Sequence, residues 1–384
     1  MKRFLDLADF SREEIEGLLE LARRLERTSE PRALAGKILG LLFFYPSLRT
    51  LASFHVAMAR LGGNSFVINP GAGSWQLETR PEPRALTGKI LGLLFFNPSL
   101  RTLASFQAAM ARLGGSSFVI NPGHGSWVLE TQRGAIMDGA AAEHVREAIP
   151  ALASYCDALG IRVFAEGRDL ASDLAETTFN SMAELTDKPL INLESALNHP
   201  CQALADWKTL DDLGVPRGGR FVLSWAWHPR ALPLAVPAAA LHMAALRGME
   251  VIVARPEGFA LPAAVMERAR RAALAAGGSV GETNEREQAL EGADVLYVKE
   301  WGATACYGDA AGDARLRSTL TGWCVRNDWF ARTAPECRVM HCLPVRRNTA
   351  IADEVLDGPR SAVQREAANR LSVQTAVLHQ LLKP

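Results

Sequence analysis

The stretch that organises this chain is KILGLLFFNPSLRT, at residues 89–102. Its apolar run is typical of a strand that is buried on both faces of a parallel sheet. The run stops at an Asn-Pro pair, and S-L-R-T then opens a helical stretch that ends at Leu-Gly-Gly, residues 113–115. A second apolar run, SFVI at residues 117–120, completes a β-α-β unit.

The same unit stands twice in the sequence. Residues 31–79 return almost unchanged as residues 83–131. Solenoid arrays need about three or more stacked units to bury a shared face, so two near-identical copies in a longer chain indicate a tandem duplication. One slot in a sheet cannot hold both copies. The paired positions that differ are Ala35/Thr87, Tyr45/Asn97, His55/Gln107, Val56/Ala108, Asn64/Ser116, Ala72/His124 and Gln76/Val128.

The composition excludes several classes of protein. A chain of 384 residues with 48% hydrophobic content can form about two domains of roughly 100–200 residues each. Because 42 basic residues balance 42 acidic ones, there is no general electrostatic attraction to nucleic acid, although a local arginine cluster could hold a small anion. No apolar run approaches the roughly 20 residues that cross a bilayer, so we expect a soluble protein without a membrane partner.

Cysteine and histidine usage point to a cytoplasmic protein without a metal. The six cysteines form no C-x-x-C pair, and Met1 leads into a polar amphipathic segment rather than a signal-peptide core. The eight histidines lack ligand spacing, and no glycine-rich phosphate motif is present, since Leu-Gly-Gly is better explained as a helix end. We therefore expect neither a metal site nor an organic cofactor.

The remaining pattern predicts an α/β fold with two domains, each with a central parallel sheet flanked by helices. Ser11 and Glu14 are spaced as a capping box for an opening amphipathic helix. A helix over about 199–213 is expected to bridge the domains, and a closing helix is expected over 366–382. The predicted strands that alternate with helical stretches are 159–164, 189–192, 221–226, 249–254, 294–298 and 338–341.

The first motif that could bind a ligand or take part in catalysis is Ser99-Leu100-Arg101-Thr102. It offers backbone N–H groups, two hydroxyls and a guanidinium at the start of a helix, which suits an anion. Taken alone, it is better explained as an N-cap serine followed by a surface arginine.

Two later motifs are H-P-C-Q at 199–202 and H-C-L-P at 341–344. His199 and Gln202 could polarise a carbonyl oxygen, or His199 could be a buried, satisfied histidine beside a proline. The later motif is also compatible with a strand end and a proline turn. Cys342 lacks an evident base, which disfavours a thiol nucleophile. His228, in W-A-W-H-P, is a further site candidate or part of a packed aromatic loop.

In this order, the three motifs resemble the aspartate/ornithine carbamoyltransferase family, over the whole chain apart from the extra copy. The resemblance implies a carbamoyl phosphate-binding domain at 1–198 and 360–384, containing the duplicated segments 31–79 and 83–131. It implies an amino-acid-binding domain at 199–359. It also implies a homotrimer with active sites at subunit boundaries, and a reaction that needs no cofactor.

The sequence is similar to one branch of this family. Ordinary ornithine enzymes carry a D-x-x-x-S-M-G loop, which is missing here. The chain instead has segments that resemble the branch using N-acetylornithine or N-succinylornithine. An acylated α-amine has no positive charge, so a different loop is chemically sensible. These segments are W-A-W-H-P at 225–229, V-K-E-W-G at 298–302, M-D-G at 137–139 and E-A-A-N-R at 366–370.

The resemblance also implies residue roles. The δ-amine of the acylornithine would attack the carbamoyl carbon, with Arg101, Thr102 and His199 stabilising the oxyanion beside Gln202 as the fourth catalytic residue. Trp127 would reach carbamoyl phosphate from a neighbouring subunit. The acylornithine contacts would be Glu194, Lys299, Leu343 and Ala142. The carbamoyl phosphate contacts would be Ser99, Leu100, Arg101, Thr102, Trp127, Arg162, His199, Gln202, Cys342, Leu343 and Arg370.

Three residues depart from the family pattern, and one of them bears on the predicted acyl group. Leu103 stands where the family often has a second arginine. One possible contact to the phosphate group is therefore lost, and Arg162 and Arg370 would have to make more of the remaining contacts. Ala142 and Ala350 stand where acetylornithine enzymes carry a glutamate and a lysine. An acidic side chain would repel a succinyl carboxylate, so Ala142 favours N-succinylornithine over N-acetylornithine, in arginine biosynthesis. An ordinary ornithine carbamoyltransferase and a catalytically silent assembly protein are the alternatives.

The second copy is the one expected to fill the working slot. Its Asn97 restores the F-F-N-P-S form, where the first copy has Tyr45, and it runs without interruption toward Arg162 and His199. The first copy is expected outside the site, either as an added edge βα unit or as a partly ordered insertion.

Overall fold

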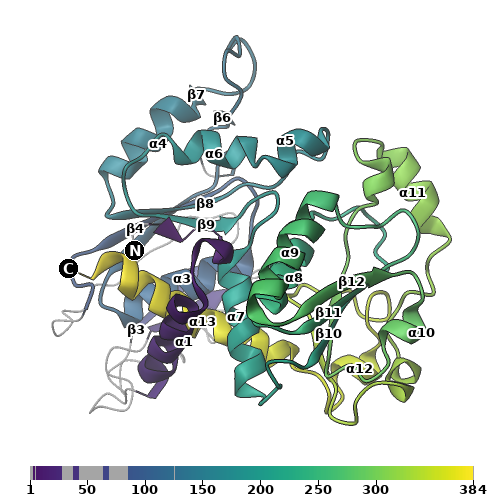
Figure 1. Cartoon of the computed structure of the whole chain (residues 1–384). Coiled ribbons are helices and arrows are strands. Elements are labelled where there is room, and N and C mark those ends of the chain that lie inside the picture. The colour runs from purple at the N-terminus through teal and green to yellow at the C-terminus, as the bar shows by residue number, and fades with distance from the viewer. Residues whose placement is uncertain are drawn as a thin grey trace, which may run out of the picture.

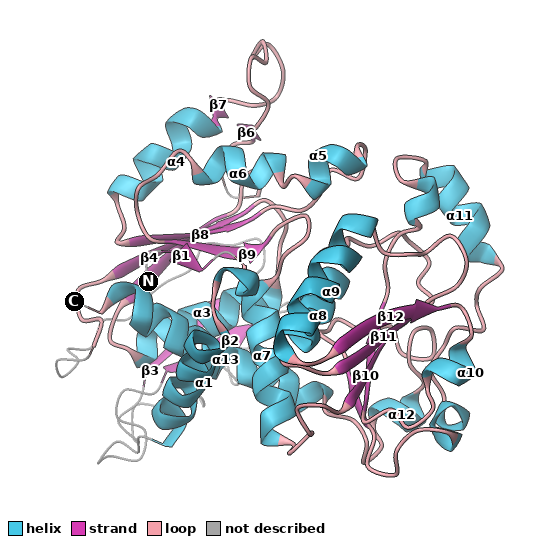
Figure 2. Ribbon diagram, viewed as in Figure 1, coloured by secondary structure: helices cyan, strands magenta, loops and turns pink. Residues whose placement is uncertain are grey.

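The computed structural model describes residues 3–4, 6–27, 38–42, 64–68, 85–124 and 126–383. Two five-stranded parallel sheets organise this part of the chain, and helices flank each of them (Figures 1 and 2). This arrangement confirms the α/β fold that the alternating pattern predicted.

The first sheet has the strand order β1-β9-β8-β4-β5. Figure 1 shows α4, α5 and α6 over one face and α1, α3 and α13 on the other. Because both faces are covered, the central strands β8 and β9 are buried along their whole length. The strands are β1 (Arg3–Phe4), β4 (Ile90–Phe95), β5 (Ser116–Ile120), β8 (Ala158–Arg162) and β9 (Leu190–Glu194). The helices are α1 (Arg12–Arg27), α3 (Leu100–Arg112), α4 (Val145–Ser154), α5 (Leu170–Leu174), α6 (Thr177–Ala183) and α13 (Val363–Leu382).

The second sheet has the order β12-β11-β10-β13-β14. Its edge strand β12 was not expected, because S-V-G-E-T lacks an apolar run. The strands are β10 (Arg220–Trp225), β11 (Glu250–Ala254), β12 (Ser279–Thr283), β13 (Val295–Lys299) and β14 (Arg338–Met340). The helices are α8 (Ala235–Leu246), α9 (Ala263–Ala276), α10 (Arg286–Ala289), α11 (Ala310–Ser318) and α12 (Asp353–Leu356), with short 3₁₀ helices η1 (Leu7–Asp9), η2 (Thr304–Cys306) and η3 (Asn327–Ala331).

Helix α7 (Pro200–Asp212) joins the two halves, as the sequence predicted. It packs against β9 of the first sheet and α8 of the second, and α13 packs on α7, α3 and α1. One hydrophobic core runs through all of these elements, from Leu91 through the fully buried Trp207 to Trp225. Both sheets therefore pack on α7 through one continuous hydrophobic core.

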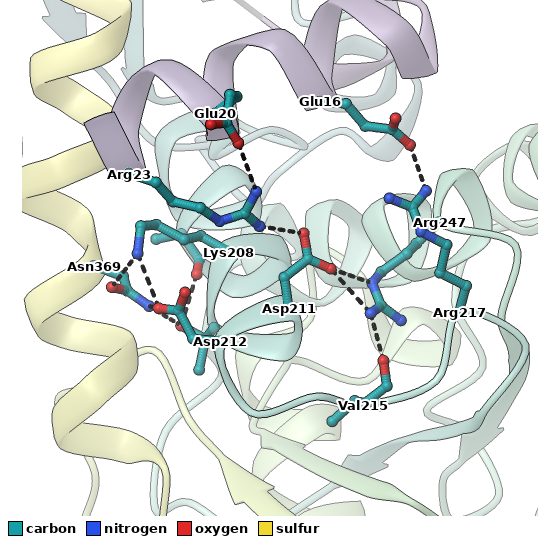
Figure 3. Close-up of polar contacts among 12 residues, drawn as sticks. Glu16, Glu20, Arg23, Lys208, Asp211, Asp212, Val215, Arg217, Arg247 and Asn369 are labelled. Atoms are coloured by element: carbon teal, nitrogen blue, oxygen red, sulfur yellow. Dashed lines mark hydrogen bonds and ion pairs between the residues drawn. The ribbon is translucent and has the colours of Figure 1, made fainter. Parts of the chain in front are cut away.

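The opening helix confirms its predicted cap and is fastened to α7. The Ser11 N–H donates to Glu14 Oε2 at 2.8 Å, and the Glu14 N–H donates to Ser11 Oγ at 3.2 Å. Farther along, Arg23 Nη2 lies 2.9 Å from Asp211 Oδ2, and Arg247 Nη2 lies 3.0 Å from Asp211 Oδ1 (Figure 3). Asp211 thus links α1 and α8 to the end of α7.

The two near-identical copies have different places in the fold. The second copy supplies β4 and β5 of the five-stranded sheet, whereas β2 (Ile38–Leu42) and β3 (Asn64–Ile68) of the first copy form a separate two-stranded parallel sheet. Strand β2 lies against α3. The expectation of an added edge unit is therefore wrong, because these strands pair with each other rather than with the larger sheet. Tyr45 and Arg49 lie outside the described residues.

No helix in the described ranges is both long and apolar enough to cross a membrane.

Candidate active site

The S-L-R-T motif starts α3 and forms the first wall of the site. Ser99 is the N-cap, and its Oγ accepts the Thr102 N–H at 3.3 Å. Arg101 is not a surface arginine, however. Its Nε is buried without a hydrogen-bond partner among the described residues, and burial lowers the pKa of its guanidinium. A cation with an unused donor at a helix N-terminus suits an anionic ligand.

Three strand ends supply the next part of the site. Arg162, at the end of β8, forms a buried ion pair with Glu194, at the end of β9. Its Nε donates to the backbone oxygen of Asn97, after β4, at 3.0 Å, and Asn97 Oδ1 accepts the Phe164 N–H at 2.9 Å. Because parallel strands end at the same edge, residues far apart in sequence meet here.

His199 occupies the N-cap position of α7 and is 3% exposed. Its Nε2 lies 3.5 Å from Glu194 Oε2, and its Nδ1 is buried without a partner in the described part of the chain. Burial, and then the charges of Arg370, Arg162 and Arg101, hold its pKa well below the usual value. The imidazole is therefore neutral at physiological pH, in a field of three guanidinium groups.

Arg370 brings the last helix into this group. Its Nη1 donates to Gln202 Oε1 at 3.0 Å and its Nη2 to Thr102 Oγ1 at 2.8 Å. The adjacent Asn369 fastens α13 to α7, because its Nδ2 donates to Asp212 Oδ2 at 3.0 Å and its Oδ1 accepts from Lys208 at 3.3 Å (Figure 3). The Arg370 Nε has no partner among the described residues.

Lys299, at the end of β13, contributes a buried cation from the second sheet. Its Nζ lies 2.8 Å from Glu300 Oε2, and Glu300 also lies 3.3 Å from His341 Nε2. Burial lowers the pKa of Lys299, but the surrounding acidic groups, Glu300 first among them, together raise it above its ordinary value. The charges of Lys299 and His341 outweigh the burial of Glu300 and lower the pKa of that carboxyl. Lys299 and Glu300 are therefore a charged pair.

The H-C-L-P segment forms a turn after β14, and its backbone conformation is unusual at Leu343. Leu343 has a φ of 56°, a left-handed conformation that costs a leucine on the order of 1 kcal/mol. The turn is held by the Leu343 N–H, which donates to His341 Nδ1 at 2.9 Å. Burial raises the pKa of Cys342 to about 12, so its thiol stays protonated and is a poor nucleophile. This raised pKa agrees with the expectation that Cys342 does not act as a nucleophile.

His228 is held in the packed loop that the sequence allowed as one alternative. It is 7% exposed, and its Nε2 accepts from Arg346 Nε at 2.9 Å. Its backbone oxygen accepts from Arg317 Nη1 at 3.3 Å. Burial lowers the pKa of the ring.

Trp127 and Ala142 make no hydrogen bond with Arg101, Arg162 or Arg370 among the described residues, and each lies next to one of two short paired strands. Both belong to the projecting loop that carries β6 (Leu129–Glu130) and β7 (Glu143–His144), at the top of Figure 1. Trp127 is 59% exposed, and its Nε1 donates to Glu143 Oε2 at 2.8 Å. The Ala142 N–H donates to the oxygen of Val128 at 3.2 Å. These contacts therefore hold the segments of Trp127 and Ala142 side by side.

The other two departures from the family pattern are packed residues. Leu103 packs against the main core from the first turn of α3. Ala350 is fully buried in a second core cluster beneath the second sheet.

Sequence reasoning gave no role to two buried carboxyl groups that back the site, Asp206 and Glu366, although Glu366 opens the E-A-A-N-R segment. Each lies one helical turn from a predicted site residue, Asp206 after Gln202 and Glu366 before Arg370. That spacing was the available signal. It also missed Glu300, which directly follows Lys299.

Known proteins resemble this chain along most of its length. The carbamoyl-P binding domain model of the aspartate/ornithine carbamoyltransferases matches residues 2–82 and again 74–212, and the Asp/Orn binding domain model matches residues 236–381. The N-succinylornithine carbamoyltransferase of Bacteroides fragilis (strain 638R) is 38% identical over 295 residues, which cover 77% of this chain and 88% of the relative.

An N-acetylornithine carbamoyltransferase of Xanthomonas campestris pv. campestris is 36% identical over 301 residues, with 77% of this chain and 88% of the relative covered. A solved structure of N-acetyl-L-ornithine transcarbamylase is also similar, with a TM-score of 0.82 and 31% identity over 99% of this chain and 100% of that one. It carries one glutamate-to-alanine replacement and is complexed with carbamyl phosphate and N-succinyl-L-norvaline. With both domain models matched and relatives of this identity along most of its length, the chain belongs to the aspartate/ornithine carbamoyltransferase family and is a carbamoyltransferase.

Proposed function

We propose that this enzyme transfers the carbamoyl group of carbamoyl phosphate to the δ-amine of an N-acylornithine, and that it prefers N-succinylornithine to N-acetylornithine. The observation that carries the proposal is the arginine cluster at His199. Arg162 pairs with Glu194, whose carboxylate lies 3.5 Å from His199 Nε2. Arg370 bonds to Thr102 beside Arg101 and to Gln202 on the helix that His199 caps, and burial and the charges of all three arginines keep His199 neutral. Three buried or half-buried guanidinium groups suit a phosphorylated dianion. A neutral imidazole among them can donate a hydrogen bond to a carbonyl oxygen without adding charge.

The chemistry follows from this arrangement. The lone pair of the δ-amine attacks the carbamoyl carbon, the bond from that carbon to the phosphate oxygen breaks, and phosphate leaves with the electron pair. Arg101, Thr102 and His199 stabilise the charge that develops on the carbamoyl oxygen. The amine proton passes to the departing phosphate, which becomes more basic as its bond breaks. No step calls for a metal or an organic cofactor.

The second half of the site suits an amino acid whose α-amine is blocked. An N-acylornithine keeps its α-carboxylate, and the charged Lys299 at the end of β13 can receive it. We propose that the domain of residues 1–198 and 360–384 binds carbamoyl phosphate and that the domain of residues 199–359 binds the acylornithine. The preference for succinyl rests on Ala142, which stands where the acetylornithine branch carries a glutamate. A solved glutamate-to-alanine variant of N-acetyl-L-ornithine transcarbamylase is complexed with N-succinyl-L-norvaline, so a relative with this fold binds a succinylated ligand.

Trp127 and Ala142 are proposed to serve the site of a neighbouring subunit. They lie together on the projecting loop, and Trp127 is an exposed large aromatic residue. Such a residue is well suited to burial between subunits. From the family resemblance we further propose a homotrimer that acts in the cytoplasm in arginine biosynthesis.

A carbamoyl transfer assay with three amino-acid substrates tests the proposal. N-succinylornithine should be turned over fastest, N-acetylornithine more slowly, and ornithine least. The His199→Ala variant is the negative control, and should lose on the order of a hundredfold in kcat, as enzymes do when one oxyanion partner is removed. Fastest turnover of ornithine would establish the ordinary ornithine enzyme, and no turnover of any substrate would establish the silent protein.

A further inference from the structure

Two buried carboxyl groups stand directly behind Gln202. Gln202 Nε2 donates to Asp206 Oδ1 at 2.8 Å and to Glu366 Oε1 at 2.9 Å. Asp206 is 1% exposed and Glu366 is fully buried. Asp206 belongs to α7 and Glu366 to α13, so the two helices meet at this amide.

These contacts fix which way the Gln202 amide points. Carboxylate oxygens accept hydrogen bonds, so the NH₂ group must face the carboxyl pair and the Oε1 must face away from it. Arg370 Nη1 agrees with this orientation, because it donates to Oε1 at 3.0 Å. An amide oxygen has two lone pairs, so one acceptor position on Oε1 is left for a ligand.

The carboxyl pair is itself held on every side. The Tyr297 hydroxyl donates to Asp206 Oδ2 at 3.0 Å, and the His341 N–H donates to Glu366 Oε2 at 2.8 Å. Burial and the nearby charge of Asp206 raise the pKa of Glu366 well above its ordinary value, and burial raises the pKa of Asp206 to about 6. A proton on Glu366 can form the hydrogen bond between the two carboxyl groups, and Arg370 is the nearby cation.

We propose that Asp206 and Glu366 are positioning residues that hold Gln202 with its oxygen toward the NH₂ group of carbamoyl phosphate. The inference rests on the proposed function, since it concerns recognition of that substrate. The reversed amide would set its own NH₂ against the carbamoyl NH₂, two donors facing each other without an acceptor. The pair thereby selects a carbamoyl group over an acyl group of the same shape.

Acetyl phosphate is the probe that separates this role from a structural one. It carries a methyl group where carbamoyl phosphate carries NH₂, so it fills the same space and presents the same phosphate but does not need the Gln202 oxygen. Dissociation constants for both ligands are measured by calorimetry on the full-length enzyme, without acylornithine. The quantity of interest is the ratio of the two constants.

The Asp206→Asn, Glu366→Gln double variant keeps the volumes of both side chains but removes the charge that orients Gln202. Its affinity for carbamoyl phosphate should fall about tenfold, and its affinity for acetyl phosphate less than about twofold. Asp211→Asn is the matched control, because Asp211 is a partly buried carboxylate of the same helix that pairs with Arg23 and Arg247, away from the site (Figure 3). It should cost stability and leave the ratio as in the wild type.

Single variants keep the test decisive if the double variant folds poorly. Glu366→Gln, which can still donate to Asp206, should retain more of the discrimination than Glu366→Leu. Combining Asp206→Asn with Gln202→Leu should change the ratio no more than Gln202→Leu alone, because both act through one amide. Equal weakening of the two ligands, or an unchanged ratio in a folded variant, would overturn the inference. Failure of the wild type to bind carbamoyl phosphate would instead refute the proposed function.

Discussion

The guanidinium of Arg370 donates a hydrogen bond of 2.8 Å to the hydroxyl of Thr102, and so joins the last helix to the first turn of α3. The same guanidinium reaches Gln202 on α7 with its other terminal nitrogen. Three helices that are far apart in sequence therefore meet at one cation. The proposed phosphate-binding side of the site is therefore complete only when α13 has packed against both α3 and α7.

The near-identical copies give a paired test of which one is catalytic. Arg101→Ala should lower kcat/KM on the order of a hundredfold or more, because the proposed oxyanion loses one charged partner. Arg49→Ala, the matching change in the first copy, should leave kcat/KM close to that of the wild type. Both are measured by carbamoyl transfer to N-succinylornithine. The reverse pattern would show that the first copy supplies the catalytic arginine.

Asn97→Tyr places the first copy's residue into the second copy. The Phe164 N–H then loses the Asn97 Oδ1 acceptor at 2.9 Å, and an unsatisfied N–H costs about 1–3 kcal/mol. The free energy of unfolding in urea should fall by that amount, and the KM for carbamoyl phosphate should rise, since Arg162 lies beside the same loop. Tyr45→Asn is the matched control and should change neither quantity. Equal effects of the two changes would contradict the interpretation that the second copy, and not the first, lies beside Arg162.

Ala142→Glu tests the basis of acyl selection. A carboxylate at this position should repel the succinyl carboxylate and reduce kcat/KM for N-succinylornithine on the order of tenfold, while N-acetylornithine is affected much less. Ala142→Gln, of similar size but neutral, separates charge from bulk. If the glutamate variant keeps its full activity with N-succinylornithine, the charge argument is wrong.

Mixing two inactive variants tests whether the projecting loop serves a neighbouring subunit. Trp127→Ala and Arg101→Ala should each be inactive alone. After the two are unfolded together and refolded at equal amounts, about a quarter of the sites in a trimer should combine an intact Arg101 with an intact Trp127 from the next subunit. Activity near that fraction supports shared sites, whereas no recovery after confirmed mixing would place both residues in one chain's site.

His242 predicts a pH-dependent difference in stability. Burial, and then the charge of Arg268, lower its pKa from 6.5 to about 4, and both ring nitrogens lack partners in the described part of the chain. The unfolded chain therefore binds a proton that the folded protein excludes, so stability falls as pH drops below 6.5. Relative to His242→Gln, the wild type should lose about 1 kcal/mol of unfolding free energy between pH 7.5 and pH 5.5. A difference between the two proteins that does not vary with pH would show that His242 does not titrate in this way.

Local sequence patterns predicted most of the elements around the site. The apolar run at 89–96 became β4 (Ile90–Phe95), and the bridging and closing helices were expected within a few residues of their ends. The edge strand β12 was missed because an edge strand does not need a continuous apolar run. The capping box at Ser11 was found because both of its partners lie within one turn.

The sequence by itself determined the α/β alternation, the three motifs and the near-identity of the two copies, because each of these is written in neighbouring residues. Chain continuity and Asn97 favoured the second copy for the large sheet, where β4 and β5 lie, but only the tertiary structure decided that β2 and β3 form a sheet of their own, since both copies have nearly the same local preferences. It also decided that Asp206 and Glu366 meet at Gln202 and that Arg370 reaches Thr102. Those contacts depend on how α7 and α13 pack, and a local pattern carries no record of which distant helix will fill the space beside it.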